Sequence, residues 1–74
     1  DPELALHGGE DGLDPYRRII PAAKIMLNDG GLLAMEVGHT QANAVMEMLK
    51  YHGFNDVSMR QDLQHIPRVV FGIK

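Results

Sequence analysis

The stretch GLLAMEVG, residues 31–38, decides the fold class of this chain. Apolar side chains follow one another directly from Leu32 to Met35, and Val37 extends the run after Glu36. A strand that helices cover on both faces has such a run, whereas a strand with one exposed face alternates apolar and polar residues. We therefore predict a central parallel strand over residues 32–37.

An amphipathic helix is predicted before this strand. Apolar residues recur at spacings of three and four between residues 13 and 27, which is the period of a helix with one buried face. Asp14 is expected to cap the first turn of a helix over residues 14–28, with Pro15 at the first helical position. Because proline lacks an amide hydrogen, Pro21 should kink this helix or mark the point where it begins.

A second helix and two further strands are predicted after the central strand. The helix has Thr40 as its expected N-cap and Gly53 near its end. Residues 56–60 alternate apolar and polar side chains, and residues 68–73 are mostly apolar, so both segments predict strands. The buried stripe of the helix consists of Ala42, Val45, Met46 and Leu49. This order of elements is half of a doubly wound α/β domain.

Composition excludes several classes of protein. With 74 residues, the chain is one small domain or part of one. Its net charge of -3 and its seven scattered basic residues argue against a surface that binds nucleic acid directly. No apolar run has the length of a membrane helix. The chain has no cysteine, which excludes disulfides and fits a reducing, cytoplasmic location.

The histidines and glycines do not predict a metal or phosphate site. No two of the four histidines have the three-to-five-residue separation of zinc ligands, and cysteine partners are absent, so we expect no metal site. The glycines at positions 8, 9 and 12 do not follow the pattern of a phosphate-binding loop. We expect a turn-rich connection there.

Four short motifs, taken in order, carry a family resemblance. They are Asp1-Pro2 with Ala5-Leu6, Gly9 with Gly12-Leu13, Glu36-x-Gly38, and Asp62-Leu63 followed by Arg68-Val69-Val70. Each is weak alone, but their order over nearly all 74 residues resembles the C-terminal part of the HemK-like family of protein glutamine methyltransferases. Members of this family modify peptide chain release factors.

The resemblance implies a specific sheet. The fold would be the C-terminal part of a Rossmann-like, S-adenosylmethionine-dependent methyltransferase domain, with a mixed sheet whose last strand is antiparallel. Residues 68–73 should then lie between residues 32–37 and residues 56–60. The far edge of residues 32–37 would lack a partner within this chain, so the N-terminal segment or a second copy should cover it. If a second copy covers it, the chain self-associates through that edge.

The resemblance also implies what the chain does not contain. In the family, the glycine-rich cofactor loop and an Asn-Pro-Pro-Tyr motif lie upstream of the position of Asp1, and neither occurs in these 74 residues. We therefore expect residues 1–74 to be a domain fragment without catalytic or cofactor-binding residues, which neither binds S-adenosylmethionine nor transfers methyl groups alone. The intact enzyme would use that cofactor to methylate a glutamine of a release factor.

Three residues are candidates for the wall of the substrate site. Asp1 and Pro2 would lie in the loop after the catalytic motif, although such a loop can equally serve only to close onto the core. Glu36 ends the central strand, at the sheet edge where α/β folds bind ligands. Its alternative role is that of a buried carboxylate satisfied by neighbouring amides.

Three other functions remain open from the sequence. The nearest is that of the sister group, which methylates a glutamine of a ribosomal protein; the motifs at residues 62–63 and 68–70 favour the release-factor group. A small α/β interaction module without enzymatic activity is the second. A methyltransferase for nucleic-acid bases is the third, and the scattered basic residues disfavour it.

Overall fold

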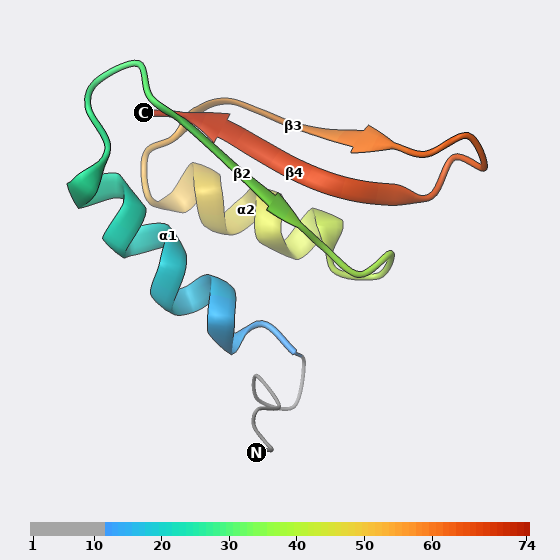
Figure 1. Ribbon diagram of the computed structural model, residues 1–74. Coiled ribbons are helices and arrows are strands. Elements are labelled where there is room, and N and C mark those ends of the chain that lie inside the picture. Colours follow the sequence, from blue (N-terminus) through green and yellow to red (C-terminus); the bar gives the residue numbers. More distant parts are fainter. Residues whose placement is uncertain (1–11) are drawn as a thin grey trace.

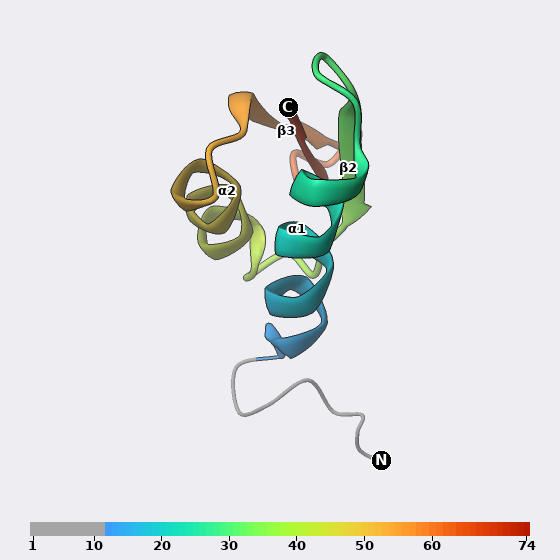
Figure 2. The ribbon, with the colours of Figure 1, turned by 90° about the vertical axis from the view of Figure 1, so that its left-hand side faces the viewer.

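The computed structural model describes residues 12–74, which form two helices and three strands (Figure 1). The elements follow in the order α1 (Asp14–Met26), β2 (Leu32–Glu36), α2 (Ala42–Tyr51), β3 (Asn55–Gln61) and β4 (Pro67–Ile73). Both helices lie on the same side of the sheet, as the two perpendicular views show (Figures 1 and 2). The result is a small α/β structure with two layers.

The strand order is β2-β4-β3, and β4 is antiparallel to both neighbours. Met35 pairs with Val70 on one side of β4, and Met59 pairs with Val70 on the other. The prediction that the last strand lies between the two preceding strands is therefore confirmed. Both pairings are antiparallel, so the parallel part of the predicted mixed sheet is not formed within residues 12–74.

The environment predicted for the strand over residues 32–37 is wrong for the described part of the chain. Strand β2 lies at an edge of the sheet formed by residues 12–74, so the expectation that its far edge lacks a partner is confirmed for these residues. Its side chains alternate between exposed and half-buried, and Leu32 is 57% exposed. The physical reason is that α1 and α2 cover the same face, so the opposite face receives no cover from residues 12–74.

The core lies between the helices and the sheet. Four side chains are completely buried: Ile20 of α1, Val45 and Leu49 of α2, and Val70 of β4. Burial of an aliphatic side chain of this size contributes about 1.5–3 kcal/mol. Because these side chains come from three elements, the core joins both helices to the middle strand.

Gly72 allows β4 to pass close to this core. A Cβ atom at this position would lie 3.1 Å from Cβ of Phe54 and 3.3 Å from Cγ2 of Val57. Gly72 itself is buried. The glycine therefore serves the packing of the sheet against the segment that leaves α2.

The N-terminal ends of both helices differ from the prediction. Leu13, not Asp14, occupies the N-cap of α1, and Asp14 instead forms an ion pair with Arg17 at 2.6 Å. Gln41, not Thr40, occupies the N-cap of α2, and neither N-cap side chain bonds the first turn. Both expected caps are thus wrong, because α1 begins one residue earlier than predicted and α2 begins one residue later.

Three other expectations about the helices can be compared with the structure. Pro15 does lie in the first turn of α1. Pro21 lies inside this helix, which neither begins nor ends there. Helix α2 ends at Tyr51, and Gly53 follows with a φ of +85° that favours glycine, so the expected end near Gly53 is confirmed.

Candidate functional site

The candidate site lies at the carboxyl end of β2. Glu36 is the last residue of the strand, and its side chain is exposed. Val37 is buried in the core, and alternation along the strand therefore directs Glu36 to the sheet face opposite the helices. On that face Glu36 shares a row with Val69 and Arg60. The buried-carboxylate alternative for Glu36 is wrong, because its side chain faces solvent in this structure.

Tyr16 of α1 holds the end of β2. Its hydroxyl donates a hydrogen bond of 2.7 Å to the backbone carbonyl of Glu36. Burial raises the pKa of Tyr16, and the negative charge of Glu36 raises it further. The phenol thus stays protonated at neutral pH and remains a donor. This bond fixes the backbone from which the Glu36 side chain extends.

Gln41 joins the turn after β2 to the segment before α1. Its Oε1 accepts a hydrogen bond of 3.0 Å from the amide of Gly38, and its Nε2 donates one of 3.2 Å to the carbonyl of Gly12. Both glycines leave room for this side chain, because a Cβ atom would lie 3.1 Å from Oε1 at Gly38 and 2.6 Å from Nε2 at Gly12. The three residues form a clamp beside Glu36.

The β3–β4 turn lies at the end of the sheet that also contains the carboxyl end of β2. Oδ1 of Asp62 accepts hydrogen bonds from the amides of Gln64 at 2.8 Å and Ile66 at 3.0 Å. Oδ2 accepts a hydrogen bond of 2.9 Å from Nε of Arg68. The amide of Ile66 and the guanidinium of Arg68 lower the pKa of Asp62 below its ordinary value. Asp62 therefore stays ionised and organises the turn.

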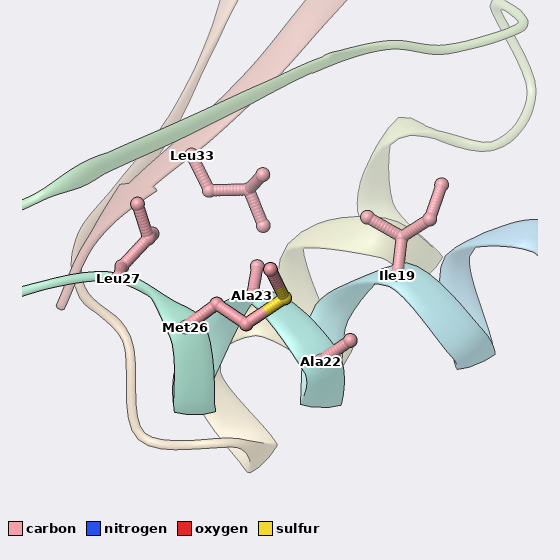
Figure 3. Close-up of a pocket in the computed structure, with 6 residues that line it drawn as sticks. All are labelled: Ile19, Ala22, Ala23, Met26, Leu27 and Leu33. Atoms are coloured by element: carbon pink, nitrogen blue, oxygen red, sulfur yellow. The ribbon is translucent and has the colours of Figure 1, made fainter.

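An apolar pocket of about 450 Å³ lies elsewhere, between α1 and the beginning of β2 (Figure 3). Glu36 does not line it, so this pocket is separate from the candidate site. Its lining is entirely apolar and consists of Ile19, Ala22, Ala23, Met26, Leu27 and Leu33. The pocket can bury apolar groups, but its side chains offer no partner to a charged cofactor.

The other site predictions have different outcomes. Asp1 and Pro2 lie outside the described residues, so the structure does not relate them to Glu36. Within residues 12–74, no group of three His, Asp or Glu side chains could hold a metal ion. Neither α1 nor α2 is long and apolar enough to cross a membrane.

Sequence reasoning did not predict the roles of Tyr16, Gln41 and Asp62. Asp62 was recognisable as a turn residue, because an Asp side chain often bonds amides two and more residues ahead. Tyr16 and Gln41 act across 20 and 29 residues of sequence. Only the folded arrangement of α1 and β2 reveals such contacts.

Comparison with known proteins shows which proteins this chain is similar to. No family model matches this chain. A release factor glutamine methyltransferase of Clostridium acetobutylicum is 45% identical over all 74 residues, which are 26% of its own length. Proteins of the same name from Geobacter sulfurreducens and Caulobacter vibrioides are 50% identical over 72 residues and 42% identical over 74 residues. The chain matches part of the HemK-like release factor glutamine methyltransferases. The predicted resemblance is thereby confirmed.

This similarity gives the site a context. The chain spans about a quarter of the length of these methyltransferases. Two of the motifs that resemble the HemK-like family, Glu36-x-Gly38 and Asp62-Leu63, lie far apart in the sequence. Strands β2 and β4 are antiparallel, and Glu36 at the carboxyl end of β2 pairs with Val69 near the beginning of β4. Both motifs therefore lie at the same end of the sheet.

Proposed function

We propose that this chain is the C-terminal part of an S-adenosylmethionine-dependent enzyme that methylates the side-chain amide of a glutamine in a peptide chain release factor. The observation that carries the proposal is the 42–50% identity, over 72 to 74 residues, to proteins named release factor glutamine methyltransferase. The strand order β2-β4-β3 supports it, because a Rossmann-like methyltransferase domain is expected to insert its last strand in this way.

The cofactor site belongs to other parts of the proposed enzyme. The charged amino-acid group of S-adenosylmethionine needs polar partners, and the pocket beside α1 is lined only by apolar side chains. The residues described here therefore do not fit the cofactor. We assign its binding to sequence outside these 74 residues, and we expect this chain alone to transfer no methyl group.

The role of this chain in the proposed enzyme is to shape the protein-substrate side of the site. Methyl transfer to an amide nitrogen depends mainly on holding that amide in line with the methyl donor. Glu36 is suited to the substrate wall because its side chain is exposed while Tyr16 and Gln41 hold the surrounding backbone. We place Asp1 and Pro2 on the same wall. The absence of cysteine fits a cytoplasmic enzyme.

The experiment uses the longer protein in which the proposal places this chain. It is incubated with S-adenosylmethionine labelled in the methyl group, and with either a release factor or a mixture of ribosomal proteins. We expect the label in the release factor. Label only in a ribosomal protein would replace the proposed substrate by that of the sister group. No transfer to either would favour a non-enzymatic interaction module.

A further inference from the structure

Gln41 bonds two segments that meet at the end of the sheet where Glu36 lies. Its Oε1 accepts the amide of Gly38, two residues after Glu36. Its Nε2 donates to the carbonyl of Gly12, two residues before α1 begins. The side chain therefore joins the entry to α1 to the turn that follows β2, at the end of the strand where open α/β folds bind ligands.

The two bonds of this side chain differ in the support that they receive from other bonds. The turn after β2 is closed a second time, because the backbone amide of Gln41 donates to the carbonyl of Gly38 at 2.9 Å. The bond to Gly12 instead joins residues that are 29 apart in the sequence. The acceptor half of the carboxamide thus reinforces a local turn, whereas the donor half holds a distant segment.

Gly12 is suited to receive this donor. A Cβ atom at this position would lie 2.6 Å from Nε2 of Gln41, so a larger residue would push the carboxamide away. Its φ of +73° is also one that residues other than glycine rarely adopt. The next residue, Leu13, is buried in the core. The chain therefore joins the core directly after the carbonyl that Gln41 holds.

We propose that Gln41 is a positioning residue for methyl transfer, which holds the segment before α1 against the Glu36 end of β2. This inference rests on the proposed function, in which the catalytic motif lies upstream of Asp1 and Glu36 belongs to the substrate wall. The chain that arrives from the motif is then fixed to the sheet at Gly12. Because methyl transfer depends on the alignment of the amide with the methyl donor, a loosened segment slows the chemical step.

The test is Gln41→Glu in the longer enzyme, with a release factor as substrate. A glutamate keeps the length of the side chain and an oxygen that accepts the amide of Gly38, but its carboxylate has no proton to donate to Gly12. We expect kcat to fall about tenfold, because the alignment of the reacting groups is impaired. KM for the release factor should change by less than about twofold, since the substrate itself does not contact Gln41.

Two glycine variants separate positioning from stability. Gly12→Ala places a Cβ atom where Nε2 of Gln41 lies, so it should lower kcat as Gln41→Glu does. Gly30→Ala imposes comparable backbone strain at a φ of +83°, but its Cβ atom would meet nothing within 4 Å. Gly30→Ala should therefore lower Tm and leave kcat unchanged at temperatures at which the enzyme is folded.

The double variant of Gly12→Ala and Gln41→Glu shows whether both changes break the same contact. Its kcat should be no lower than that of the slower single variant, because the bond is already lost in each. Multiplied losses of kcat in the double variant would contradict a shared contact.

Three further results would overturn the inference. An unchanged kcat of Gln41→Glu removes it directly. A kcat that falls in Gly30→Ala as it does in Gln41→Glu, in proportion to the loss of Tm, would show that Gln41 serves stability alone. If the unmodified enzyme transfers no methyl group to a release factor, the proposed function fails and the positioning role fails with it.

Discussion

Gln41 and Gly12 are 29 residues apart in the sequence, yet Nε2 of Gln41 donates a hydrogen bond to the carbonyl of Gly12. The same side chain accepts the amide of Gly38. One amide group thus holds the entry to α1 against the turn that follows Glu36. This clamp fixes the turn that directly follows Glu36, the candidate residue at the end of β2.

The first prediction concerns the clamp itself. Gln41→Ala should lower the free energy of unfolding by about 1–2 kcal/mol, because two hydrogen bonds are lost. The measurement is urea unfolding of the longer protein in which the proposal places this chain. Gln61→Ala, at the exposed end of β3, is the control and should change it by less than about 0.5 kcal/mol. Equal effects of both substitutions would show that the clamp does not stabilise the fold.

The second prediction separates backbone strain from loss of space at glycines. Gly12 and Gly30 have φ values of +73° and +83°, which an alanine adopts at a cost of about 1–2 kcal/mol. A Cβ atom at Gly12 would also displace Nε2 of Gln41, whereas nothing lies within 4 Å of one at Gly30. Gly12→Ala should therefore destabilise the protein more than Gly30→Ala.

A double substitution checks this reasoning. In the Gln41→Ala background the side chain that Gly12→Ala would displace is already gone. The cost of Gly12→Ala should then fall to that of Gly30→Ala, as measured by the same unfolding experiment. Strict additivity of Gly12→Ala and Gln41→Ala would contradict the contact between these two residues.

The third prediction is a pH dependence at the β3–β4 turn. The pKa of Asp62 is lowered in the folded state, so its contribution to stability is present above the ordinary Asp pKa of about 3.9 and is lost as the pH falls through the folded value. NMR should show the amide shifts of Gln64 and Ile66 titrating together. The midpoint of this titration should lie below the ordinary Asp pKa of about 3.9. In Asp62→Asn both titrations should disappear. A midpoint at or above the ordinary value would contradict the bonding described here.

The fourth prediction concerns the free edge and bare face of β2. Leu32 and Ala34 are exposed on the face that neither α1 nor α2 covers, and Phe71 and Ile73 of β4 lie beside them in the register. The 74-residue chain should therefore self-associate, since an apolar strand edge recruits another chain. Sedimentation should show dimers or larger species that Ala34→Lys reduces. A monomer at all concentrations would remove this expectation.

Strand order was predictable from the sequence, but local contacts were not. The insertion of residues 68–73 between the other two strands was implied by the resemblance to the methyltransferase family. The helix caps were misassigned because Asp14 and Thr40 are ordinary cap residues, while the helices begin after Leu13 and Gln41. Statistical preference for a residue type does not reveal that the Gln41 side chain bonds both the nearby Gly38 and the distant Gly12.

The apolar run of residues 32–37 shows how a sequence pattern can predict more cover than the described residues provide. Its pattern predicted cover on both faces, and residues 12–74 supply cover on one. The pattern describes the surroundings for which a strand is suited, whichever segment provides them. Glu36 interrupts the run, and its side chain is exposed. Its place at the carboxyl end of the strand was predictable from the sequence, whereas the hydrogen bond from Tyr16 to its backbone carbonyl was not.

The most direct test of the proposed function locates the transferred methyl group. The longer protein is incubated with S-adenosylmethionine and a release factor, and fragment-ion mass spectrometry then identifies the modified atom group. We predict one added methyl on a glutamine side chain of the release factor, and none when the 74-residue chain replaces the longer protein. A release factor without added methyl, or a methyl group on any other residue type, would contradict the proposal.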